Sequence, residues 1–133
     1  MARDILLVED SPVDVELCKK HIEKAGLSNR VVVANNGLEA LKIIDGHTDE
    51  SLSPDAVLLL DIILPEMGGL ELLEQIRLRP EWMRSPVIML TSSAEPEHVL
   101  KAKQNGVHGY VLKSNLAQSF SSENGPFLSA LAS

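Results

Sequence analysis

Five residues that can do chemistry stand directly after short aliphatic runs. They are Glu9 and Asp10 after ILLV, Asp61 after AVLLL, Thr91 after PVIML and Lys113 after GYVL. If these runs are parallel strands of one sheet, their carboxyl ends meet at one edge, which is where open α/β sheets bind their ligands. Carboxylates suit a divalent cation, whereas a hydroxyl and an ammonium suit a phosphoryl group. The pattern therefore predicts a combined cation and phosphoryl site.

The three carboxylates define this chemistry most sharply. If the first and third runs are neighbouring strands, Glu9, Asp10 and Asp61 bring three like charges into one small space, and such repulsion requires a cation. Mg²⁺ suits the site because it takes oxygen ligands and is bound through one or two carboxylates together with phosphate oxygens. Asp61 could then act as a nucleophile toward phosphorus, since aspartates carry phosphoryl groups as covalent intermediates. Thr91 and Lys113 would clamp the transferred group.

These residues can meet only if the aliphatic runs form one sheet. The runs expected to be strands are 5–8, 31–34, 56–60, 87–90 and 110–112. Between them, apolar residues recur at helical spacing in four segments, which begin near Pro12, Leu38, Leu70 and Pro96. Strands that alternate with helices through short connections predict an α/β fold, with a doubly wound parallel sheet of five strands and helices on both faces.

The expected core is aliphatic. Hydrophobic residues make up 44% of the chain and aromatic residues only 3%, which suits buried parallel strands filled by Leu, Val, Ile and Ala. The helical periodicity assigns Leu17 and Ile22 to the apolar face of the first helix and Leu38 and Leu41 to that of the second.

Length and charge limit the functional classes. The 133 residues predict a single domain, 1–133, with an irregular tail from about residue 117, because Gly125-Pro126 interrupts any continuous helix there. The net charge of -7 excludes non-specific nucleic-acid binding. Cys18 is the only cysteine, the amino terminus lacks a secretion signal, and no apolar run approaches the roughly 18 residues of a membrane span. A cytoplasmic protein is expected, with neither nucleic acid nor membrane as a partner.

Four motifs that carry the candidate residues resemble those of one protein family. LLVED, LLLDIILPEMGG, VIMLTSS and GYVLKS stand in the order and spacing of the receiver domains of two-component response regulators, over the chain to about Leu116. The resemblance implies the flavodoxin-like receiver fold, with strand order 2-1-3-4-5. It also implies a switch that takes a phosphoryl group from a histidine kinase phosphohistidine and signals to a partner by changing conformation. Such a protein catalyses only its own phosphorylation and dephosphorylation.

The resemblance implies a role for each position of the site. Asp61 is the expected phosphoacceptor. The expected Mg²⁺ ligands are the side chains of Glu9, Asp10 and Asp61 and the backbone oxygen of Ile63. Thr91 and Lys113 are expected to contact the phosphoryl group. Tyr110, three residues before the lysine, matches an aromatic residue that switches together with Thr91.

A finer resemblance concerns the first third of the chain. LLVEDSPVDVEL, NRVVVANNGLEAL and the longer loop before the third strand are most similar to stand-alone receivers that work with bacterial phytochrome-type histidine kinases. The resemblance implies such a kinase as the upstream partner and leaves the downstream protein unknown. A homodimer is also expected, because no effector domain is recognised and the tail is apolar and irregular.

Three positions depart from the family's pattern. Ser114 follows the lysine where proline after a cis peptide is usual, so the conformation of this peptide stays open. Gly68 replaces an aspartate in the turn after the acceptor, and Gly125-Pro126 interrupts the terminal helix.

Three other functions fit parts of the pattern. A haloacid-dehalogenase-like phosphatase also uses a strand-end aspartate and Mg²⁺, but it needs a second aspartate two residues later as acid and base, where this chain has Ile63. A receiver-like interaction module that signals without phosphorylation would not need the complete set of acids, hydroxyl and lysine. A flavodoxin-like flavin carrier would need a Ser/Thr/Gly-rich phosphate loop after the first strand, and none follows.

Overall fold

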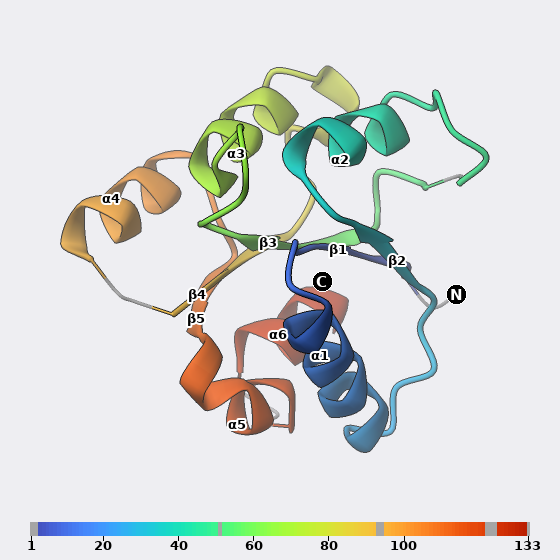
Figure 1. Cartoon of the computed structure of the whole chain (residues 1–133), viewed down its shortest axis with the longest axis vertical. Coiled ribbons are helices and arrows are strands. Elements are labelled where there is room, and N and C mark those ends of the chain that lie inside the picture. Colours follow the sequence, from blue (N-terminus) through green and yellow to red (C-terminus); the bar gives the residue numbers. More distant parts are fainter. Residues whose placement is uncertain (1–2, 51, 93–94, 122–124, 133) are drawn as a thin grey trace.

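A parallel sheet forms the middle layer of the structure, a computed structural model that describes residues 3–50, 52–92, 95–121 and 125–132 (Figure 1). Its strands are β1 (Ile5–Val8), β2 (Val31–Ala34), β3 (Val57–Asp61), β4 (Val87–Thr91) and β5 (Gly109–Leu112). They pair in parallel in the order β2-β1-β3-β4-β5. The predicted fold class and strand order are therefore confirmed.

Helices cover both faces of the sheet. They are α1 (Pro12–Lys24), α2 (Gly37–Ile44), α3 (Gly69–Arg77), α4 (Pro96–Gln104), α5 (Leu116–Ser121) and α6 (Pro126–Ala132), with short 3₁₀ helices at Pro80–Trp82 and Lys113–Asn115. Figure 1 shows α2, α3 and α4 on one face and α1, α5 and α6 on the other. Among the described residues, no helix has both the length and the apolar character needed to cross a membrane.

The start of α1 is fixed close to the end of β1. Ser11 is the N-cap residue, and its side-chain oxygen accepts a hydrogen bond from the backbone N–H of Asp14 at 3.3 Å. Pro12 occupies the first helical turn, where its missing N–H and fixed φ are favourable. The helix ends before Gly26, whose φ of 79° is a left-handed conformation that glycine adopts without strain. As a result, the first turn of α1 lies beside the carboxyl edge of the sheet.

Alternate strand residues supply two separate cores. In β1, Leu6 and Val8 pack with α2 and α3, whereas Ile5 and Leu7 pack with α1, α5 and α6. All four side chains are fully buried. Burial on both faces explains why the sequence of a central strand is apolar at every position, and each such side chain contributes roughly 1.5–3 kcal/mol.

Two of the predicted core residues are exposed. Leu17 on α1 is 41% exposed and Leu38 on α2 is 53% exposed, so their assignment to the buried faces was wrong. The buried residues of the two helices are Val15, Cys18 and Ile22 in α1, and Gly37, Ala40, Leu41, Ile43 and Ile44 in α2. An apolar stripe that is wider than the contact surface has flanking residues, and spacing alone cannot identify which ones dock.

The C-terminal segment forms two helices, α5 and α6, each of which buries a phenylalanine. The rings of Phe120 on α5 and Phe127 on α6 contact edge to face, with centroids 4.5 Å apart, and both side chains are fully buried. Together with Ala130 they extend the core that lies beside α1. Residues 122–124 and 133 of the predicted tail lie outside the described residues. The two phenylalanines of the tail therefore belong to the core, and the expected homodimer stays a prediction.

Candidate functional site

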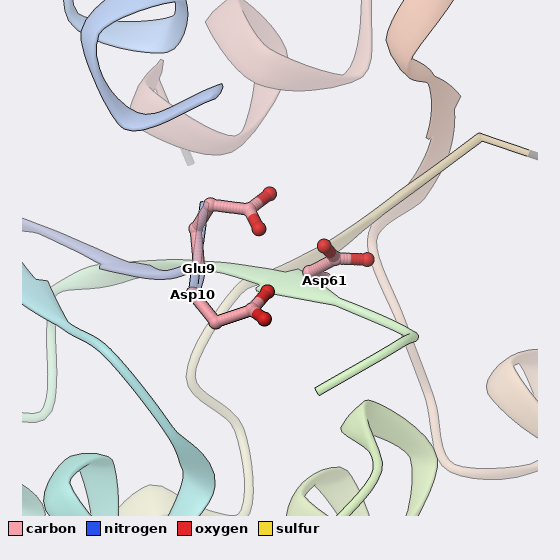
Figure 2. A group of neighbouring side chains, drawn as sticks. All are labelled: Glu9, Asp10 and Asp61. Carbon is pink, nitrogen blue, oxygen red and sulfur yellow. The ribbon is translucent and has the colours of Figure 1, made fainter. Parts of the chain in front are cut away.

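The carboxyl edge of the sheet brings the predicted site residues together. Glu9 and Asp10 follow β1, Asp61 ends β3, Thr91 ends β4 and Lys113 follows β5. Because β1 and β3 are paired neighbours, the three carboxylates converge, with one oxygen of each within 4.8 Å of the others. Figure 2 shows the carboxylates of the first two residues on opposite sides of the β1 end, both extending toward that of the third.

The three carboxylates differ in exposure. Glu9 is 1% exposed and Asp61 is 4% exposed, whereas Asp10 is on the surface. Burial raises the pKa of Glu9 to about 7; the bond from Lys113 opposes this effect, and the charge of Asp61 adds to it. A buried carboxylate beside a second one is unfavourable in its charged form, and a bound cation would remove this penalty.

Lys113 supplies the positive charge of the site. Its Nζ lies 2.6 Å from Oε1 of Glu9, 2.8 Å from Oδ2 of Asp14 and 2.8 Å from Oδ2 of Asp61. Although burial by itself lowers the pKa of this ammonium, the bonds to the three carboxylates raise it above its ordinary value. The lysine is therefore charged and neutralises part of the cluster. The peptide bond to Ser114 is trans.

Asp14 is a site residue that the sequence reasoning did not select. It lies in the first turn of α1, and its carboxylate accepts a hydrogen bond from Lys113 although 99 residues separate the two. The available signal was its position four residues after Asp10, because a helix that starts at this edge places its first turn beside the strand ends.

The loop after β3 holds Asp61 in place. The backbone N–H of Ile63 donates to Oδ1 of Asp61 at 3.1 Å, and the N–H of Gly69 donates to the carbonyl of Ile62 at 2.8 Å. The side chain of Ile63 is 64% exposed, so only its backbone is relevant to the site. In the same loop Glu66 has a φ of 65°, a left-handed conformation that costs roughly 1–2 kcal/mol for a residue with a Cβ.

Thr91 is coupled to the predicted switch residue. Thr91 is 1% exposed, and its side chain hydrogen-bonds that of Tyr110 on the neighbouring strand β5. Burial raises the pKa of Tyr110, and the bond with Thr91 acts in the opposite direction. The hydroxyl that is expected to contact a phosphoryl group therefore already has an interaction that would change if that group were present.

We expect Glu9→Gln to stabilise the metal-free protein at pH 8. The pKa of Glu9 rises from 4.5 to about 7 on folding, so between these values the folded chain binds more protons than the unfolded chain. The free energy of unfolding then decreases as the pH rises through this window. Glutamine cannot ionise and removes this loss, so the expected gain at pH 8 is about 3 kcal/mol. Urea unfolding in EDTA at pH 8 and at pH 4.5 measures it, and the gain should disappear at the lower pH. An equal effect at both pH values would contradict the raised pKa.

The donor set fits a hard divalent cation. The group of converging ligand residues found among the described residues consists of carboxylates alone. Oxygen-only sites favour Mg²⁺, Mn²⁺ or Ca²⁺ over metals that prefer nitrogen or sulfur. Two of the three carboxylates are shielded from water, which strengthens their attraction for a cation.

Fold and site together define a class of protein. The carboxylates lie at the point where the strand order reverses between β1 and β3, which is the ligand position of doubly wound sheets. A hydroxyl and an ammonium beside them complete a receiver of the flavodoxin-like class. The chain belongs to the family of response regulator receiver domains, whose family model matches residues 5–121. Its function is phosphorylation-based signalling in a two-component system.

Relatives and solved structures agree with this assignment. Response regulator Rcp1 of Synechocystis sp. is 32% identical over 112 residues, which cover 83% of this chain and 76% of that protein. The bacteriophytochrome response regulator RtBRR has a TM-score of 0.81 and 38% identity, and the match covers 99% of this chain and 77% of that one. The Mn²⁺-bound form of Rcp1 has a TM-score of 0.80 and 28% identity over 91% of both chains. The resemblance to phytochrome-type response regulators is confirmed.

Proposed function

We propose that Asp61 accepts a phosphoryl group from the phosphohistidine of a sensor kinase and that the reaction requires Mg²⁺. The proposed ligands are the side chains of Glu9, Asp10 and Asp61 and the backbone oxygen of Ile63. The observation that carries the proposal is the convergence of the three carboxylates within 4.8 Å, with the Lys113 ammonium 2.8 Å from Asp61. The existence of a Mn²⁺-bound form of the relative Rcp1 supports the binding of a divalent cation.

Each residue has its own task in the transfer. A carboxylate oxygen of Asp61 forms a bond to phosphorus while the bond from phosphorus to the kinase imidazole breaks, and the imidazole leaves with that electron pair. When bound, the cation neutralises charge on the transferred group. Lys113 holds its ammonium beside that group, and Thr91 donates its hydroxyl to a phosphoryl oxygen. Since this hydroxyl also bonds Tyr110, phosphorylation biases the arrangement of the pair.

The proposed partners follow from the similarity to RtBRR. We infer that a bacterial phytochrome-type histidine kinase acts upstream of this chain and that a separate protein acts downstream. We also propose that residues 1–133 form a single receiver domain and that the protein acts in the cytoplasm. The chain catalyses only its own phosphorylation and dephosphorylation. We propose that a homodimer would form through exposed apolar side chains outside the tail, whose phenylalanines are buried. Leu100 on α4, for example, is 58% exposed. A monomer at high concentration in both phosphorylation states, measured by sedimentation, would exclude this dimer.

Acetyl phosphate as donor tests the proposal. The wild-type chain with Mg²⁺ is expected to gain one phosphoryl group by intact mass, whereas the wild type in EDTA and Asp61→Asn with Mg²⁺ should gain none. Asp55→Asn, which removes an exposed carboxylate before β3, is the matched control and should be phosphorylated like the wild type. Phosphorylation of Asp61→Asn would exclude this acceptor, and release of phosphate over many turnovers would point to a phosphatase.

A further inference from the structure

Asp14 gives the Lys113 ammonium a partner outside the carboxylate cluster. Nζ of the lysine bridges Oδ2 of Asp14 and Oδ2 of Asp61, at 2.8 Å from each. The oxygens that converge as a candidate cation site come from Glu9, Asp10 and Asp61, and Asp14 is not one of that group. The lysine therefore contacts two kinds of carboxylate: those that would share their charge with a cation and one that would not.

This difference matters once the site is loaded. A cation would compete with the lysine for the oxygens of Glu9 and Asp61, and a phosphoryl group would bond to an oxygen of Asp61, so two of the three bonds that hold the lysine are weakened. A lysine side chain has many rotamers, so an ammonium without a fixed partner spreads over several positions. The bond to Asp14 is not subject to this competition. It can keep the ammonium in place while the acceptor changes its own partners.

We propose that Asp14 is a positioning residue for the phosphorylation of Asp61, holding the Lys113 ammonium where the phosphoryl group arrives. The inference rests on the proposed role of Asp61 as acceptor. Asp14 is itself an anion and repels a phosphoryl group, but its side chain is 32% exposed and the ammonium intervenes, so solvent and lysine screen this repulsion. The direct bond at 2.8 Å is the stronger effect.

Three variants separate positioning from charge. Asp14→Ala removes the acceptor and the charge, Asp14→Asn retains an acceptor oxygen without the charge, and Glu16→Ala removes an exposed charge from the same helix. Beryllofluoride, which stands in for the phosphoryl group, is titrated at saturating Mg²⁺ by calorimetry. The rate of phosphorylation by acetyl phosphate and the affinity for Mg²⁺ alone are measured in parallel. Thermal unfolding shows whether each variant is folded. If Asp14→Ala does not fold, Asp14→Asn is the variant that is compared with the wild type.

Asp14→Ala is expected to lose about fivefold in both beryllofluoride affinity and phosphorylation rate, which is the effect of losing a partly exposed charged pair. Its affinity for Mg²⁺ alone should change by less than about twofold. Asp14→Asn should lose less than about twofold, because a neutral acceptor still holds the ammonium. Glu16→Ala should behave like the wild type. Wild-type or tighter binding by Asp14→Ala, an equal loss in Asp14→Asn, or an equal loss in Glu16→Ala would overturn the proposal. A wild type that takes no phosphoryl group would instead refute the function of Asp61.

Discussion

Replacement of Lys113 by methionine is expected to slow the phosphorylation of Asp61 by about 100-fold, the usual effect of removing one group that stabilises developing charge. The same change should destabilise the metal-free protein by about 3 kcal/mol at pH 8. The physical reason is that one ammonium serves three carboxylates, at 2.6 Å from Glu9 and 2.8 Å from Asp14 and Asp61. Methionine keeps most of the side-chain volume and removes only the charge and the donors.

The effects of pH and of Mg²⁺ on this variant have definite signs. Glu9 is 1% exposed, and without the lysine its pKa should rise further above 7, so the protonated form is retained to higher pH. The loss of stability should therefore be smaller at pH 5.5, where Glu9 is neutral and needs no partner. Mg²⁺ should bind the variant about tenfold more tightly, because the ammonium no longer competes for the same carboxylates. Stabilisation by Mg²⁺ should then exceed that of the wild type.

Urea unfolding at the two pH values and calorimetric titration with Mg²⁺ measure these effects. Lys103→Met, which removes an exposed charge from α4, is the control for net charge and should change each quantity little. If Lys113→Met bound Mg²⁺ as weakly as the wild type, the ammonium would not be the competitor that the distances indicate.

The strand-end residues of the site could be predicted because their position follows from chain direction alone. All strands of a doubly wound sheet run the same way, so Asp61 and Thr91 reach the same edge whichever faces the helices cover. The same reasoning located Glu9 and Lys113, since each directly follows a short apolar run that forms a strand. Nothing about the rotation or tilt of a helix is needed for these four positions.

Positions that depend on how a helix docks could not be predicted in this way. The contact between Asp14 and Lys113 requires α1 to lie close to the end of β5, a tertiary arrangement that local spacing does not encode. Leu38 is exposed because of the way α2 is rotated about its own axis, and a rotation by about one residue would change which side chains face the sheet. In the tail, Gly125-Pro126 signals that a helix is interrupted, but burial of Phe127 depends on where the chain turns afterwards.

Gly69→Ala is expected to destabilise the protein by about 3 kcal/mol and to slow its phosphorylation at least about tenfold, as overpacking at a site with no room does. Gly69 is buried at the first position of α3, in the loop that holds the acceptor. A Cβ there would collide with the carbonyl oxygen of Asp61 and lie 2.8 Å from the Cα of Ile62. These are backbone atoms that no rotamer change can move, so the loop and the acceptor must shift together.

Gly68→Ala is the matched control for this loop. A Cβ at Gly68 meets only the carbonyl oxygen of Ile62, at an ordinary 3.5 Å, and the φ of -65° suits any residue. Helix propensity alone would make alanine about 1 kcal/mol better than glycine in a helix interior, so a loss at Gly69 must come from lack of space. Urea unfolding and the rate with acetyl phosphate measure both variants. If Gly69→Ala were as stable and as reactive as Gly68→Ala, the close approach of α3 to the Asp61 backbone would not constrain the acceptor.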